Sequence, residues 1–263
     1  MTASTYSRVV LATAFLALLL GAWFTGLSGT GTPVSFPAHS SVGFAAVALA
    51  AIQIITSRRA GAGPFRWSIA ALALLLADAV TGGATRAPLP VPVAILHACL
   101  APLAITALAI VVASFSGRAS SLSTGGGAIR LSPSIRGAAW AAPPVAVLQI
   151  VFGAAYRHKV WGVLPHMGGA LVLALLAIVA SAAIVQRIQE NSQLKSASVT
   201  VLTAVLSQVA LGIAAFVMRL LDVDGTPLFN AVASLHVATG SAVLASTTVL
   251  AWRLQKIAFG LSQ

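Results

Sequence analysis

Residues 163–186 read VLPHMGGALVLALLAIVASAAIVQ, a run of 24 residues without a charged side chain. A membrane-spanning barrel strand would instead alternate apolar and polar residues over about 10 positions. A helix of about 20 mostly apolar residues is long enough to cross the hydrocarbon core of a bilayer. This run therefore predicts a transmembrane helix.

The rest of the chain has the same character. Of its 263 residues 59% are hydrophobic and 7% are charged, whereas a soluble domain carries about 25% charged residues. We therefore predict an all-α integral membrane protein with eight transmembrane helices. The predicted spans cover residues 9–28, 38–57, 67–83, 91–115, 138–156, 163–186, 199–219 and 228–254.

Basic residues are distributed unevenly between the two sets of connecting segments. Eleven of the 15 Lys and Arg residues lie in one set, and the other set holds only Arg86, Arg157, Lys159 and Arg219. The positive-inside rule makes the richer set cytoplasmic and places both termini inside. We expect a multi-pass protein of the cell inner (plasma) membrane. Its net charge of +11 is then a topology signal, and we expect no nucleic-acid partner.

A segment of flexible composition divides the eight spans into two groups of four. Residues 120–127 read SSLSTGGG, which is typical of a linker. We predict an N-terminal half over residues 1–118, a cytoplasmic linker over 119–136 and a C-terminal half over 137–263. Each half is expected to form a four-helix bundle, and the two bundles to be pseudo-symmetric.

A weak internal repeat supports this division. Each odd-numbered span carries a glycine near the end that we expect to face outwards. The residue four positions earlier is Gln in the second half but not in the first; the pairs are Ala17 and Gly21, Asp78 and Gly82, Gln149 and Gly153, and Gln208 and Gly212. Glycine there would let another helix or a flat ligand approach the backbone closely, although glycine is also common in membrane helices.

Four of the five histidines lie on even-numbered spans at a similar depth: His39, His97, His166 and His236. The fifth, His158, lies in a loop, where we expect a solvated side chain. A single histidine near a membrane interface is usually a hydrogen-bonded packing residue. Four on alternate spans at one level indicate a function, because ionisable groups within the membrane are costly.

Two imidazoles on two helices of a bundle suit the axial positions of a haem iron. A metal ion alone usually takes three or more protein ligands, and no carboxylate lies near these histidines in the sequence. The sequence therefore predicts one haem site per half. Arg86, Arg157 and Arg219 lie on the same expected side, where guanidinium groups pair well with haem propionates.

With this arrangement of histidines, the chain resembles the haem A synthase family over nearly its whole length. The family has eight spans in two pseudo-symmetric halves, with a histidine pair on the second and fourth helices of each half. The matching pairs here are His39 with His97 and His166 with His236. The short segments that are similar to the family's are residues 149–157 (QIVFGAAYR), 165–166 (PH), 208–212 (QVALG), 235–236 (LH) and 21–26 (GAWFTG).

The resemblance implies that His166 and His236 hold a haem b. It implies that His39 and His97 border the catalytic site, where the methyl group of haem O is oxidised to give haem A. The protein would then be an oxidoreductase of haem A biosynthesis and cytochrome oxidase assembly, with haem b as electron relay. Respiratory-chain or oxidase-assembly proteins would be its partners.

The chain departs from the family pattern in two places. The family usually has Glu three residues before the first histidine, where this chain has Phe36. The cysteine pair that some members carry in the first outer loop is absent. Asp78 is the nearest acid that could replace the missing Glu, but it lies on another predicted span.

Phe36 favours an alternative: a non-enzymatic haem-binding membrane protein of the same fold, serving as an electron carrier, haem-delivery factor or respiratory-complex subunit. A small-molecule transporter is a third interpretation. It is disfavoured because no predicted span is interrupted and because Asp78 is the only charged residue expected near the middle of the membrane.

The charge distribution leads to a topology prediction. Residues 121–127 should be cut by protease in inside-out membrane vesicles and protected in right-side-out vesicles, because the segment is expected to be cytoplasmic. Fragment sizes on a gel report the outcome. Cleavage only in right-side-out vesicles would reverse the orientation, and with it the outer placement of the four histidines.

Overall fold

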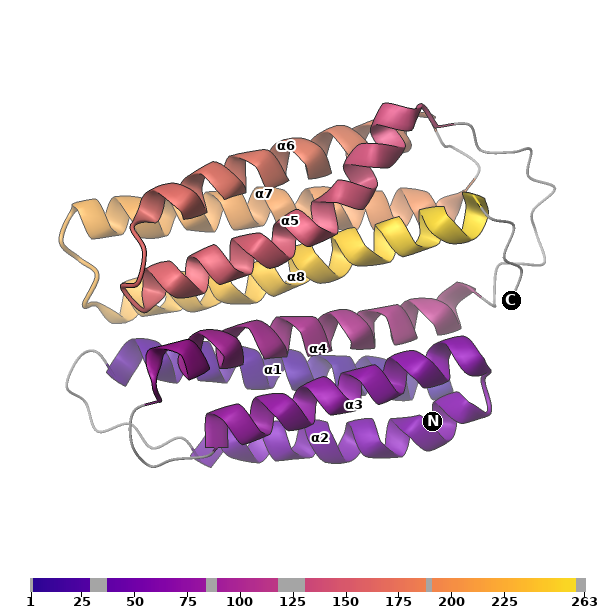
Figure 1. Cartoon of the computed structure of the whole chain (residues 1–263), viewed down its shortest axis with the longest axis horizontal. Coiled ribbons are helices and arrows are strands. Elements are labelled where there is room, and N and C mark those ends of the chain that lie inside the picture. The colour runs from indigo at the N-terminus through magenta and orange to yellow at the C-terminus, as the bar shows by residue number, and fades with distance from the viewer. Residues whose placement is uncertain (1, 29–36, 84–88, 118–130, 188–190, 259–263) are drawn as a thin grey trace.

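The computed structural model describes residues 2–28, 37–83, 89–117, 131–187 and 191–258 (Figure 1). Eight helices in this part of the chain are long and apolar enough to cross a membrane, which confirms the predicted all-α integral membrane fold. They are α1 (Ala3–Ser28), α2 (Pro37–Arg58), α3 (Ala62–Gly83), α4 (Val91–Gly117), α5 (Pro133–Arg157), α6 (Val163–Arg187), α7 (Ser192–Leu220) and α8 (Pro227–Ala258).

The helices extend beyond the predicted apolar spans. The odd-numbered helices begin five to seven residues earlier than predicted, because a helix continues into polar sequence until a cap ends it. Ser132 caps α5 by accepting a hydrogen bond from the Ile135 amide, and Pro133 occupies the first turn. The linker predicted over residues 119–136 is therefore too long at its C-terminal end. Its residues 119–130 lie outside the described part of the chain.

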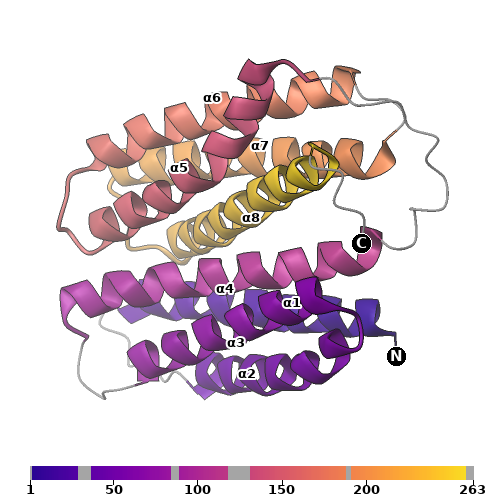
Figure 2. The same cartoon turned by 45° about the vertical axis from the view of Figure 1, so that its right-hand side comes forward.

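The helices form two four-helix bundles, α1–α4 and α5–α8, which lie side by side in both views (Figures 1 and 2). Within each bundle, helices adjacent in sequence pack together, and the first helix packs against the fourth. The first and third helices therefore oppose each other across one diagonal, and the second and fourth across the other. Because the chain runs up and down, all even-numbered helices begin at the same end of the molecule.

Each bundle has its own apolar core. Val10, Ala50 and Leu108 are among the buried residues of the first core, and Ile184 and Val201 are among those of the second. Many core positions in both bundles hold alanine, and this small side chain lets the helices approach closely. Close packing matters in lipid, because the hydrophobic effect does not drive helices together there. The helices α4 and α8 pack against each other and join the two bundles.

Polar contacts hold the end of α1 against the second bundle. The Arg157 Nη2 atom on α5 donates to the Ala22 carbonyl at 3.1 Å, and the Asn230 Nδ2 atom on α8 donates to the Trp23 carbonyl at 3.0 Å. Gly26 leaves room for Asn230, because a Cβ there would overlap the Asn230 side chain. These contacts fix the two bundles relative to each other at the end where the even-numbered helices begin.

Candidate functional site

The four membrane histidines meet in two pairs, one inside each bundle. His39 on α2 faces His97 on α4, with ring centres 6.4 Å apart and ring planes inclined by 80°. His166 on α6 faces His236 on α8, with 6.0 Å between ring centres and an inclination of 82°. Each pair spans the diagonal of its bundle, so the structure brings together the residues that the sequence pairs.

A glycine on the preceding helix packs against each imidazole. A Cβ atom at these glycines would approach the histidine Cε1 atom to 3.0 Å or less, which is closer than such atoms pack. These four glycines are the ones in the internal repeat, where we expected another helix or a flat ligand to approach the backbone. In the structure the group that approaches it is the imidazole of the next helix. The distances from the added Cβ to the histidine Cε1 atom are 2.8 Å for Gly21 and His39, 2.5 Å for Gly82 and His97, 3.0 Å for Gly153 and His166, and 2.9 Å for Gly212 and His236.

The residue four positions before each glycine bonds the same imidazole. In the first half both partners are hydrogen-bond acceptors. The Nδ1 atom of His39 donates to the Ala17 carbonyl at 2.9 Å. The Nδ1 atom of His97 lies 3.1 Å from the Asp78 carbonyl and 2.9 Å from the Asp78 Oδ1 atom. Both Nδ1 atoms therefore carry the proton, which leaves the Nε2 lone pair available to a metal.

In the second half the partners are glutamine side chains. The Gln149 Nε2 atom lies 2.9 Å from the Nδ1 atom of His166 and donates to its backbone carbonyl at 2.6 Å. The Gln208 Nε2 atom lies 3.3 Å from the Nε2 atom of His236. The Thr239 hydroxyl donates to the Gln208 Oε1 atom.

Glycines make room for both amides. A Cβ at Gly169 would overlap the Gln149 Oε1 atom, and a Cβ at Gly240 would lie 3.1 Å from the Gln208 Nε2 atom. An amide nitrogen donates, so the ring nitrogen that it contacts accepts. Turning the Gln208 amide by 180° would offer its Oε1 atom to the imidazole instead, whereas turning the Gln149 amide would set its Oε1 atom against the His166 carbonyl. The Gln149 Oε1 atom is buried without a hydrogen-bond partner among the described residues.

Each imidazole thus has one nitrogen held by the preceding helix. In the described part of the chain the other nitrogen has no hydrogen-bond partner: Nε2 of His39, His97 and His166, and the buried Nδ1 of His236. These free nitrogens belong to rings that face one another in pairs. The arrangement therefore leaves two nitrogen donors available in each bundle.

The donor set in each bundle consists of two imidazoles. No group of three or more His, Cys, Asp or Glu side chains that would hold a metal ion occurs among the described residues. Two imidazoles that bind one iron from opposite sides, with bonds of about 2 Å and a ring centre about 1 Å behind each nitrogen, would have ring centres roughly 6 Å apart. The separations of 6.4 Å and 6.0 Å match this spacing.

Two of the predicted cationic residues, Arg157 and Arg219, lie at the same end of the molecule as the histidines but have protein partners. The Arg219 Nη1 atom donates to the Tyr156 hydroxyl at 2.6 Å, and its Nε atom lies 3.5 Å from the Asp224 carboxylate. The Tyr156 ring in turn stacks on His166, with 6.5 Å between ring centres. Arg157 bonds the Ala22 carbonyl. Arg86 and Phe36 lie outside the described residues.

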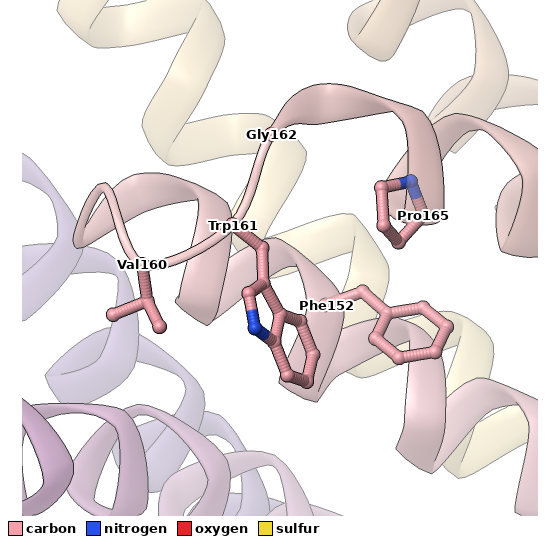
Figure 3. Close-up of a pocket in the computed structure, with 5 residues that line it drawn as sticks. All are labelled: Phe152, Val160, Trp161, Gly162 and Pro165. Atoms are coloured by element: carbon pink, nitrogen blue, oxygen red, sulfur yellow. The ribbon is translucent and has the colours of Figure 1, made fainter.

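A shallow surface pocket of about 470 Å³ lies next to the turn between α5 and α6 (Figure 3). Its lining includes the Phe152 and Trp161 rings, which meet edge to face with 5.8 Å between centres, and Pro165, which directly precedes His166. Val160 and Gly162 complete the lining.

His158 lies close to this turn and is only partly exposed. Burial, and then the neighbouring Arg157 charge, lower the pKa of His158 below the usual histidine value. The prediction of a freely solvated side chain is therefore only partly right.

Asp78 is the site residue that sequence reasoning placed least well. It lies on a different helix from both first-half histidines, and its distance to either of them does not follow from sequence spacing. The signal was nevertheless present, because Asp78 precedes Gly82 by four residues, as Gln149 precedes Gly153. The repeat position identifies the residue that bonds the imidazole of the next helix.

No protein-family model and no curated protein matches the chain. The membrane-helical fold is shown by the structure. The resemblance to the haem A synthase family remains a prediction that depends on the residues described above.

The glycine contacts lead to a prediction on stability. Gly212→Ala should destabilise the protein by about 1–3 kcal/mol, because the added methyl group pushes against His236 in a packed bundle. Gly168→Ala is the matched control: no atom lies within 4 Å of its added Cβ. There alanine should be neutral or slightly stabilising, because it favours the helix. Thermal unfolding in detergent measures both; equal melting temperatures would contradict the close contact.

Proposed function

We propose that this chain is a haem A synthase-like membrane oxidoreductase whose two histidine pairs are axial haem ligands. The observation that carries the proposal is the spacing of two facing imidazoles in each bundle, 6.4 Å and 6.0 Å between ring centres. We place the protein in the cell inner (plasma) membrane, with both termini in the cytoplasm and the histidines near the outer face.

The surrounding residues support a ligand role for the imidazoles. A metal-bound histidine usually gives its second ring N–H to an acceptor, which fixes the ring orientation. Ala17 and Asp78 provide such acceptors to His39 and His97.

Haem, when bound, supplies one-electron redox chemistry. The protein's own part is to hold the imidazoles in place. The glycines bring the preceding helix against each ring, and the bonds to Ala17, Asp78, Gln149 and Gln208 prevent the rings from turning. Preorganised ligands of this kind lose little free energy when they bind.

We assign different tasks to the two halves. His166 and His236 would hold a resident haem b that serves as electron relay. His39 and His97 would border the pocket where the methyl group of haem O is oxidised to give haem A. The observation behind this division is that neutral amides bond the second pair, whereas a carboxylate bonds His97 in the first half. Haem-handling proteins of the respiratory chain or of oxidase assembly would be its partners.

Asp78 also bears on the absent family glutamate. The family's acid is replaced by Phe36, which can neither accept a proton nor stabilise a positive charge developing on a substrate carbon. Asp78 is a carboxylate in direct contact with a first-half imidazole, so the first-half site does retain an acid. That contact favours retained chemistry.

Phe36 itself favours a second function, a haem-binding protein without catalysis. A phenyl ring near a haem pocket would exclude water and strengthen haem retention. Such a protein would serve as an electron carrier, a haem-delivery factor or a subunit of a respiratory complex.

Haem binding is tested by the spectrum of the purified protein. His166→Ala and His236→Ala should each remove or shift a low-spin b-type reduced-minus-oxidised spectrum, because each deletes one of two axial ligands. His158→Ala is the control and should leave the spectrum unchanged. If both single variants keep the spectrum and the haem content, the assignment is wrong. If His39→Ala loses the resident haem while His166→Ala keeps it, the two halves have the opposite tasks.

Catalysis is tested in cells that make haem O but lack their own haem A synthase. Expression of the unaltered chain should yield haem A in the extracted haem, measured by chromatography. Haem A would exclude the binding-only function. If haem A is absent but appears with Phe36→Glu, the chain keeps the scaffold and has lost the reaction.

A further inference from the structure

Asp78 is a carboxylate within a membrane-spanning helix, and its ionic partner is a histidine. Its Oδ1 atom lies 2.9 Å from the Nδ1 atom of His97, and the two side chains are 17% and 27% exposed. No Lys or Arg of the described chain pairs with it. This carboxylate is largely removed from water, so its negative charge is poorly screened and acts mainly on the neighbouring imidazole.

The internal repeat shows that this charge is unique to one site. The equivalent positions on the other odd-numbered helices are Ala17, Gln149 and Gln208, and all of these are uncharged. All four positions contact the imidazole of the following helix. The four imidazoles therefore share a packing arrangement and differ in the charge of the group that bonds them.

Resting on the proposed function, we propose that Asp78 is a positioning residue that makes His97 the most electron-donating of the four ligands and so gives the first-half haem the lower reduction potential. The Asp78 carbonyl accepts the Nδ1–H bond of His97, and the Asp78 carboxylate lies 2.9 Å from the same nitrogen. The negative charge of the carboxylate favours a positive charge on the ring and so raises the basicity of the imidazole. A more basic axial ligand and a nearby negative charge both favour ferric over ferrous iron. A weakly solvated site strengthens both effects, because the charge is poorly screened.

The second half provides the neutral comparison. Neutral amides contact both rings: Gln149 at the Nδ1 atom of His166 and Gln208 at the Nε2 atom of His236, and the Gln208 amide is further fixed by the Thr239 hydroxyl. A neutral amide places no net charge beside the imidazole, whereas a carboxylate does. The second-half haem should therefore have the higher potential, and the two halves should titrate separately.

The full chain, purified in detergent and loaded with haem b, is titrated electrochemically while its optical spectrum is recorded. In a His166→Ala background only the first-half site remains. There D78N should raise the midpoint potential, because Asn keeps the size and an acceptor oxygen but removes the charge. Asp222→Asn is the matched control: it removes one negative charge from the turn after α7, away from His97, and should leave the potential unchanged.

The reciprocal variant moves the charge to the other half. In a His39→Ala background Q149E should lower the potential of the second-half haem. In the protein with all four histidines, D78N should move only the lower of the two transitions, which tests the assignment without a ligand deletion.

Two results would overturn the proposal, and they are distinguishable. If the first-half haem is bound but D78N leaves its potential unchanged, Asp78 does not tune the ligand, while the haem-binding function stands. If the folded wild-type chain binds no haem in either half, the proposed function and the role of Asp78 fail together.

Discussion

The contact between a glycine on one helix and an imidazole on the next underlies both candidate sites. It occurs four times, with a glycine Cβ position 2.5–3.0 Å from the ring in every case. A larger residue would separate the helices or turn the ring, so the diagonal spacing of the paired imidazoles depends on these glycines. The contact also places the residue one turn earlier beside the ring, where it bonds a ring nitrogen. One spacing of four residues therefore fixes both the position and the orientation of each histidine.

This unit separates what is constant in the two halves from what varies. Glycine and histidine are the same in all four copies, whereas the bonding residue is Ala17, Asp78, Gln149 or Gln208. In the first half backbone carbonyls accept from both rings and a carboxylate lies beside His97, and in the second half two amides contact the rings. The repeat thus builds two histidine pairs of similar geometry and different electrostatics. A duplicated bundle can divide two tasks in this way without a change of fold.

The fold was largely predictable from the sequence, because eight apolar runs of helix length have few alternative structures in a bilayer. The helix starts were not, since the first turns of α5 and α7 are polar and depend on caps such as Ser132 and Asn191. The pairing of His39 with His97 and of His166 with His236 followed from depth and helix parity. The contact of Asp78 with His97 did not, because sequence spacing alone gives no rotation of α3 relative to α4. The roles of Arg157 and Arg219 were also beyond the sequence, since their partners Ala22, Tyr156 and Asp224 lie on other segments.

The contacts of the two arginines connect the second pocket with the rest of the molecule. Arg219 bonds Tyr156, whose ring stacks on His166 at an inclination of 11°. The next residue, Arg157, bonds α1 of the other bundle, and Asn230 bonds the same helix from α8. The end of α5 therefore contacts one imidazole of its own bundle and the helix whose Gly21 packs against His39 in the other. A shift of the end of α5 would therefore disturb contacts in both bundles. The two bundles pack as one unit through these contacts of α5 and α8 with α1.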